Sequence, residues 1–206
     1  MSKKEYKSIA IIGPDGSGKT SVVNLMSLQT KAIVIYCGKR NFYYKIMDNF
    51  NKLILALPYF LFPIKIYLRY IFYIFETFDV NKRINSINSN KIIERYYVDR
   101  LIRFDELILL YRAKAIRPIT YFIEIPFAYL MNIFYSKKIK KNKINIVLLN
   151  VEASLLFSRS SGEYKNVLLA EIKNTCYLKY KRFYKQIINV QSNTSIENIV
   201  NQIKFN

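Results

Sequence analysis

The 206-residue sequence contains no histidine and only two cysteines, Cys37 and Cys176. Without histidine, a Ser-His-Asp or Cys-His nucleophilic centre is excluded, and so is a metal site built on imidazole ligands. The two cysteines lie far apart in the chain and have no CxxC spacing. The sequence therefore predicts two reduced, buried thiols and no zinc site.

Acidic residues are also scarce: 14 Asp and Glu stand against 33 Lys and Arg, which gives a formal net charge of +19. The basic residues are mostly lysines among many Ile, Asn and Tyr, a mixture that AT-rich codon usage produces, and no base-reading motif accompanies them. We therefore expect anionic small substrates and no nucleic-acid partner. The basic run at 137–143 is expected to form a solvated loop, with contact to anionic lipid as the alternative.

Short apolar runs alternate with longer helical patterns, which is typical of a parallel sheet with helices on both faces. Strands are expected over 8–13, 32–36, 91–94, 144–150 and 186–190, and helices over 19–29, 153–184 and 195–203. No repeat and no Pro/Gly-rich linker divides the chain. The sequence thus predicts an α/β fold of three layers, with a five-stranded parallel sheet, in a single domain over 1–206.

The most apolar stretch, 53–75, approaches the length of a membrane span. Two prolines interrupt it, and a stripe of charged side chains marks the helix at 64–78 as amphipathic. The charged residues of this stripe are Lys65, Arg69, Glu76 and Arg83. We expect the opposite aromatic face to pack on the sheet or on the partner subunit of a homodimer, with a peripheral membrane contact as the alternative. Because the apolar run near the N-terminus is too short for a secretory signal, a cytoplasmic location is expected.

Three of the five glycines fall within GPDGSGKT, at 13–20. This stretch satisfies G-x-x-x-x-G-K-[ST] and stands between a predicted strand and a predicted helix, the context of a phosphate-binding loop. Lys19 is expected to neutralise the β- and γ-phosphates of ATP, and Thr20 to supply a hydroxyl to Mg²⁺. The residues expected to bind the nucleotide are Gly13, Pro14, Asp15, Gly16, Ser17, Gly18, Lys19, Thr20 and Ser21.

Asp15 needs a separate explanation, because a carboxylate inside a phosphate-binding loop repels the phosphate unless it faces another group. It is expected to face the phosphate acceptor, the alternative being a turn former that stabilises the loop. GPDGSGKT resembles the phosphate loop of thymidylate kinases, in which this acidic position faces the sugar of the acceptor. The resemblance extends along nearly the whole chain.

In KIIERYYVDR (91–100), Glu94, Arg95 and Tyr96 resemble the Asp-Arg-Tyr motif of thymidylate kinases. The resemblance implies that Glu94 assists at Mg²⁺, that Arg95 contacts the acceptor phosphate and that Tyr96 lines the acceptor pocket. A surface ion pair at the end of a strand is the alternative for Glu94 and Arg95. The acceptor region would span about 37–100. There the family's Arg-Glu-Pro element is replaced by YCGKRNFYY, in which Arg40 is the substitute candidate and Lys39 the alternative.

The segment 144–159 is similar to the family's strand that runs into a lid helix, whose arginines close over the ATP phosphates. The resemblance implies a lid over about 153–170 with Arg159 as its catalytic arginine, and an exposed helix arginine is the alternative. The expected catalytic set is Lys19, Asp15, Arg95 and Arg159. The expected metal ligands are Thr20 and Glu94, and the acceptor-binding residues are Asp15, Arg40, Arg95 and Tyr96.

The resemblance implies an ATP- and Mg²⁺-dependent kinase that phosphorylates a nucleoside monophosphate such as dTMP. Two alternatives stay open. The first is a kinase of the same fold that acts on a sugar or a lipid-linked saccharide, which the missing Arg-Glu-Pro element and the aromatic helix favour. The second is a P-loop NTPase switch or a basic, membrane-associated binding module.

Overall fold

The structure is a computed structural model and describes residues 8–37, 49, 62–142, 144–160 and 162–203. Its strands are β1 (Ser8–Ile12), β2 (Ile33–Tyr36), β3 (Lys91–Glu94), β4 (Asn145–Val151) and β5 (Gln186–Val190). They form one five-stranded sheet in the order β2-β3-β1-β4-β5, in which every neighbouring pair is parallel. The predicted five-stranded parallel sheet is confirmed.

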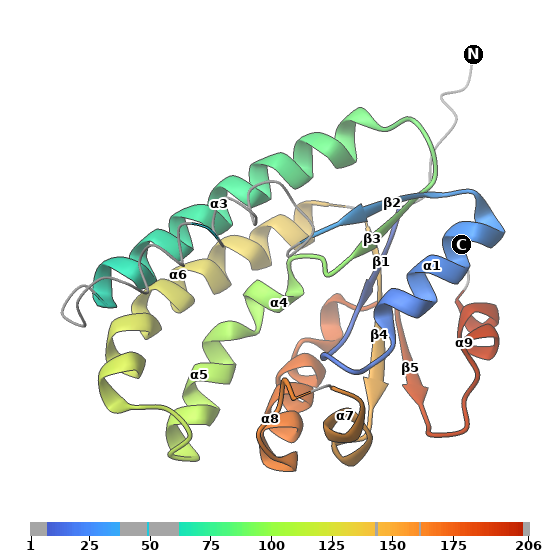
Figure 1. Cartoon of the computed structure of the whole chain (residues 1–206). Helices are drawn as coiled ribbons and strands as arrows, with labels where there is room; N and C mark the ends of the chain where they lie inside the picture. The colour runs from blue at the N-terminus through green and yellow to red at the C-terminus, as the bar shows by residue number, and fades with distance from the viewer. Residues whose placement is uncertain (1–7, 38–48, 50–61, 143, 161, 204–206) are drawn as a thin grey trace.

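Helices cover both faces of this sheet (Figure 1). They are α1 (Lys19–Thr30), α3 (Phe62–Ser86), α4 (Val98–Leu101), α5 (Arg103–Arg112), α6 (Pro118–Lys141), α7 (Ala153–Arg159), α8 (Val167–Lys179) and α9 (Ile196–Gln202). α1, α7 and α9 contribute to the core on one face, and α3, α4, α5 and α6 to the core on the other. α8 contributes residues to both cores. The three-layer α/β architecture is therefore also as predicted.

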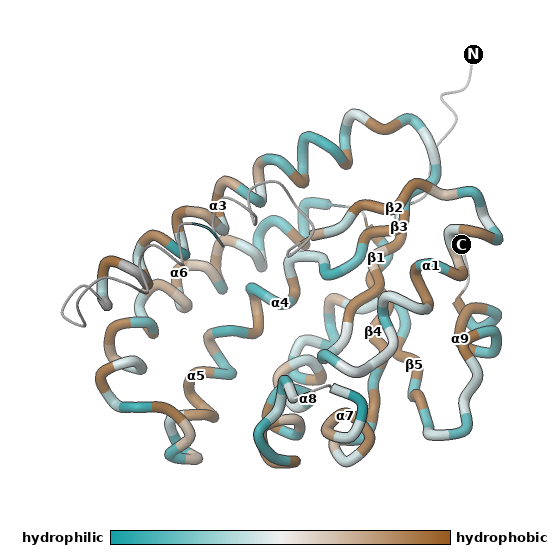
Figure 2. The backbone as a smooth tube through the Cα atoms, in the orientation of Figure 1, coloured by the Kyte–Doolittle hydropathy of each residue, from teal (hydrophilic) through white to brown (hydrophobic). Residues whose placement is uncertain are grey.

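Each central strand is apolar along its length because its two faces are both buried, and the hydrophobic residues of the strands run through the middle of the fold in Figure 2. Successive side chains of β1 alternate between the cores: Ile9 and Ile11 join α1, whereas Ala10 and Ile12 face α3 to α6. β4 follows the same period of two. A one-residue slip of either strand would exchange its two faces.

The single helix predicted over 153–184 is wrong, because the structure divides this segment into α7, α8 and a short 3₁₀ turn over Lys181–Phe183. Gly162 lies between the two helices with φ of 86°, a conformation that a continuing helix does not contain. α8 begins after its N-cap residue, Asn166, whose Oδ1 accepts a hydrogen bond from the backbone N–H of Leu169 at 3.0 Å. This side-chain cap replaces the hydrogen bond that the helix interior would have supplied.

The expectation of a loop over 137–143 is wrong for residues 137–141, which form the last turns of α6. Lysine is a good helix former, and cations near a helix C-terminus interact favourably with the helix dipole. Lys138, Lys140 and Lys141 lie in that last turn. Their charges therefore favour the helix they were expected to interrupt.

The predicted amphipathic helix is confirmed as α3, which is longer than the expected 64–78. Its buried side is formed by Ile66, Tyr70, Val80 and Ile84, whereas part of the aromatic face remains outside, with Phe75 54% and Phe78 58% exposed. Within the described residues, no helix is long and apolar enough to cross a membrane. Both cysteines are buried and free, as predicted.

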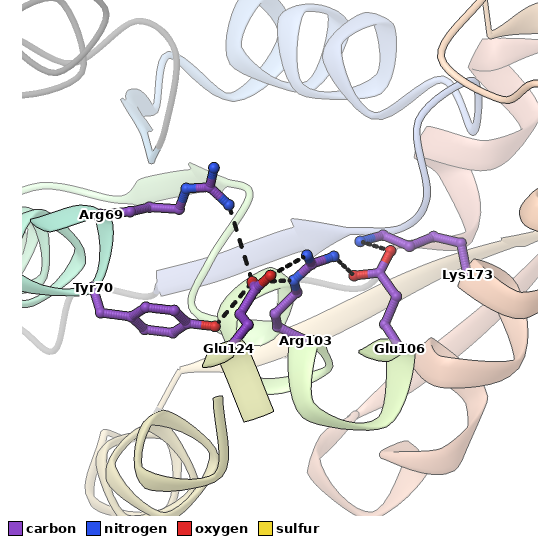
Figure 3. Close-up of polar contacts among 6 residues, drawn as sticks. All are labelled: Arg69, Tyr70, Arg103, Glu106, Glu124 and Lys173. Carbon is purple, nitrogen blue, oxygen red and sulfur yellow. Dashed lines mark hydrogen bonds and ion pairs between the residues drawn. The ribbon is translucent and has the colours of Figure 1, made fainter. Parts of the chain in front are cut away.

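A chain of alternating charges joins α3, α5, α6 and α8 beside the sheet (Figure 3). Glu124 of α6 is buried and accepts hydrogen bonds from Arg103 Nε at 2.8 Å and Nη2 at 3.0 Å, and from Tyr70 Oη at 3.1 Å. Arg103 also contacts Glu106, which pairs with Lys173. Burial raises the pKa of Glu106, but the positive charges of Lys173 and Arg103 lower it by more than burial raises it. The net shift of the pKa is therefore downward.

We expect Glu124→Ala to lower the free energy of unfolding by about 3 kcal/mol, because it leaves the Arg103 guanidinium without the carboxylate that compensates its desolvation. Denaturant-induced unfolding measures this loss. Glu171→Ala, which removes an exposed glutamate of α8, is the matched control and should change stability by less than about 0.5 kcal/mol. Equal stability of the two variants would contradict a structural role for the Glu124 pair.

Candidate functional site

The phosphate-binding loop follows β1 at the carboxyl edge of the sheet and leads into α1. A Cβ atom at Gly13 would lie 2.7 Å from the carbonyl oxygen of Leu149, so no larger residue fits between the loop and β4. Gly18, the N-cap of α1, has φ of 85°, a left-handed conformation that glycine adopts without strain. These two constraints explain why Gly13 and Gly18 occur in a chain with few glycines. The N-terminus of α1 then lies at the end of the loop, and the N-terminus of a helix favours anions.

Lys19, the first residue of α1, points back across the loop. It is 5% exposed, and its Nζ donates a hydrogen bond to the carbonyl oxygen of Pro14 at 2.7 Å. Asp15 Oδ1 lies 3.6 Å from the same nitrogen. Burial lowers the pKa of Lys19, although the nearby carboxylates of Asp15, Asp99 and Glu94 act in the opposite direction. A bound anion would add to the stabilisation of the charged form.

Thr20 and Glu94 meet beside the loop, although 74 residues separate them. Thr20 Oγ1 donates to Glu94 Oε1 at 2.8 Å. Glu94 is 5% exposed, and its Oε2 is buried with no hydrogen-bond partner among the described residues. Hydroxyl and carboxylate oxygens are the ligands that Mg²⁺ prefers. In the described part of the chain, no group of three or more acidic or cysteine side chains could hold a metal by itself.

Arg95 connects β3 to the phosphate loop. Its Nη2 contacts Asp15 Oδ1 at 2.6 Å, and its backbone N–H donates to the carbonyl oxygen of Ile11 at 3.3 Å. Arg95 has φ of 56°, an uncommon conformation for a residue with a side chain, and such residues cluster at functional sites. The structure therefore brings together two residues, Asp15 and Arg95, that the sequence analysis assigned to the acceptor.

Tyr96 is fully buried, and its Oη accepts a hydrogen bond from Asn142 Nδ2 at 2.7 Å. It lines a small cavity of about 20 Å³ beyond Arg95, whose wall also includes Asp99 and Arg100. The same Asp99 and Arg100 line a larger cavity of about 280 Å³ that reaches α3 and α8. The two cavities therefore share part of their walls.

The segment expected to act as a lid contacts the loop through Tyr164. The backbone N–H of Asp15 donates to Tyr164 Oη at 3.1 Å, a contact that the sequence analysis did not anticipate. The side chain of Arg159 points elsewhere: its Nη2 is 3.4 Å from the carbonyl oxygen of Ser192. Ser192 lines an open cavity of about 890 Å³ between the ends of β4 and β5. Arg40, the other cationic candidate, lies outside the described residues, and Ser21 is exposed on α1.

Asp99 is a second residue that the sequence analysis missed. Tyr177 Oη of α8 donates a hydrogen bond to its Oδ1. Burial raises the pKa of Asp99, although the charges of Lys19, Lys173 and Arg95 act to lower it.

No protein-family model and no curated protein matches the chain. Solved structures do. The chain is similar to a thymidylate kinase from Candida albicans, with 15% identity, a TM-score of 0.66 and coverage of 96% of this chain and 88% of that one. It is also similar to deoxyadenosine kinase from M. mycoides with bound dATP, with 16% identity, a TM-score of 0.60 and coverage of 94% and 95%.

The same M. mycoides kinase with bound dCTP matches at 14% identity, with a TM-score of 0.53 and coverage of 94% and 95%. At these identities the likeness concerns the fold, and it extends over most of each chain. The fold that the thymidylate kinase resemblance implied is thereby confirmed. The chain has a P-loop fold of the type seen in nucleoside and nucleoside monophosphate kinases.

Proposed function

We propose that this protein is an ATP-dependent kinase that transfers the γ-phosphate to a nucleoside monophosphate such as dTMP. The observation that carries the proposal is the contact between Asp15 and Arg95, at 2.6 Å. It connects the phosphate loop to the cavities beyond β3, where an acceptor would bind. A P-loop NTPase switch has no need of a second pocket opposite its phosphate loop, so this arrangement favours transfer over hydrolysis.

On the donor side, the backbone N–H groups of the loop, the N-terminus of α1 and Lys19 would hold the ATP phosphates. The orphaned Glu94 Oε2 and the Thr20 hydroxyl fit Mg²⁺, which when bound neutralises charge on the β- and γ-phosphates. Arg159 and the polar cavity between β4 and β5 are the candidates for contact with the remainder of the nucleotide.

On the acceptor side, Arg95 would exchange its contact with Asp15 for the anionic acceptor, since a guanidinium binds phosphate oxygens through two parallel hydrogen bonds. The Asp15 carboxylate would then accept a hydrogen bond from an acceptor hydroxyl. An acceptor oxygen would bond to the γ-phosphorus as the bond to the β–γ bridging oxygen breaks and ADP leaves. Because positioning and charge neutralisation supply most of the catalysis in such transfers, a protein without histidine can perform it.

The test of this function is ADP release from ATP and Mg²⁺ with a panel of acceptors. We expect a nucleoside monophosphate to stimulate ADP release and to be recovered as its diphosphate. Release that is independent of any acceptor would indicate an NTPase. Stimulation by a sugar or a lipid-linked saccharide alone would replace the proposed acceptor with the alternative one.

We expect Lys19→Ala to lower kcat at least about 100-fold, because it removes a preorganised positive charge from the transferring phosphates. Steady-state kinetics measures the loss, and circular dichroism tests whether the fold is intact. Lys31→Ala, at the far end of α1, is the control and should retain activity. Undiminished turnover by the Lys19 variant would contradict the assignment of the phosphate loop.

We expect Arg95→Lys to leave the affinity for ATP within about twofold, but to lower kcat/KM for the acceptor by roughly tenfold to a thousandfold, which corresponds to about 1.4 to 4 kcal/mol. Lysine keeps the charge but not the two-pronged geometry. Arg83→Lys, on the outer side of α3, is the matched control. A parallel fall in ATP affinity and activity would assign Arg95 to the donor site instead.

A further inference from the structure

Glu76 of α3 is a buried carboxylate whose two oxygens have different surroundings. The residue is 8% exposed. Its Oε2 accepts a hydrogen bond from Arg100 Nη2 at 2.7 Å. Its Oε1 is buried and has no hydrogen-bond partner in the described part of the chain. A buried polar atom left in this way costs about 1–3 kcal/mol, so a group that supplies the missing hydrogen bond would bind there favourably.

Glu76 lies in the wall of a cavity, a position from which its carboxylate can contact a ligand. Glu76 lines the small cavity of about 20 Å³, and Arg95 lines the same cavity. That volume accommodates about one water-sized group, such as a single substituent of a larger molecule. Asp99 and Arg100 also line the neighbouring cavity of about 280 Å³, whose volume approaches that of a small-molecule site.

The cavity walls favour a flat, aromatic ligand. Tyr97 and Tyr135 stack with ring centroids 5.4 Å apart, and both line the small cavity. In the larger cavity, the Arg100 guanidinium lies 3.6 Å above the ring of Tyr73. Planar side chains of this kind pack on the faces of a heterocycle, while Glu76 and Arg100 offer an acceptor and donors at its edge.

We propose that Glu76 is a specificity-determining residue of the acceptor site, where its Oε1 accepts a hydrogen bond from the exocyclic amine of a nucleobase. This inference rests on the proposed function, because it takes the reacting end of the acceptor to lie at Arg95. A carboxylate offers only acceptor atoms. A base that presents a carbonyl at the same position brings two acceptors together and leaves Oε1 without a partner. Adenine and cytosine are therefore favoured over hypoxanthine, uracil and thymine, which narrows the proposed acceptor from dTMP to a nucleoside monophosphate with an amino-bearing base.

Two pairs of nucleotides test this preference: dAMP against dIMP, and dCMP against dUMP, in which a carbonyl replaces the amine and the adjacent ring nitrogen gains a proton. Isothermal titration calorimetry with the full chain, in the absence of ATP, gives the four dissociation constants. We expect the wild-type protein to bind at least one amino-bearing nucleotide about tenfold or more tightly than its carbonyl partner. In Glu76→Gln this preference should fall below about threefold, because the amide can also donate to a carbonyl.

Glu171→Gln makes the same chemical change on the exposed side of α8 and should keep the wild-type preference. A wild-type protein that binds none of the four nucleotides, or binds both members of each pair within threefold, would overturn the inference whatever the folding of the variant. So would a preference that survives in Glu76→Gln. The ADP-release assay distinguishes failure of this inference from failure of the proposed function. If the protein prefers amino-bearing nucleotides but transfers no phosphate to them, the kinase function is wrong and the role of Glu76 stands. If it transfers phosphate without that preference, the role of Glu76 is wrong and the kinase function stands.

Discussion

The parallel pairing of β1 with β3 is the interaction on which the candidate site depends. In this register Ile11 lies opposite Glu94, so both strands end at the same level of the carboxyl edge. The phosphate loop leaves β1 where Glu94 and Arg95 leave β3, and contacts between Thr20 and Glu94 and between Asp15 and Arg95 follow directly. β1 is also where the chain changes direction across the sheet, with β3 on one side and β4 on the other, the position at which such sheets bind ligands.

Charge compensation organises the rest of the site. Lys19, Arg95, Asp15 and Glu94 form a cluster in which each charge lies near an opposite one. Desolvation makes every isolated charge in such a cluster unfavourable, and the partners offset that penalty. The cluster also contains atoms that have no hydrogen-bond partner among the described residues, such as Glu94 Oε2. A charged ligand gains the most binding free energy where it can contact such unpartnered polar atoms, because the neighbouring charges are already compensated.

α3 has two functions in this arrangement. Its buried side completes the core against α6, while Glu76 and Arg69 direct charge toward the cavities beyond β3. Glu76 belongs to the polar stripe that helical periodicity identified. A stripe of charges is ordinarily solvated, but Glu76 is buried, and Arg100 of α4 supplies the compensating cation. The periodicity therefore predicted the polar side of the helix correctly, but it did not predict which residues pack against that side.

The sequence by itself determined the phosphate loop, the five strands and the α/β class, because these depend on local spacing: glycines at set intervals and apolar runs between helical patterns. It also placed Asp15 and Arg95 in one site through their resemblance to a known motif. Only the tertiary structure decided that Tyr164 contacts the loop, that the segment 153–184 divides at Gly162 and Asn166, and that Glu76 is buried with one oxygen to which no described residue donates a hydrogen bond. These features depend on contacts between residues far apart in the chain, or on caps whose strength is set by their surroundings, and no local pattern of residues contains that information.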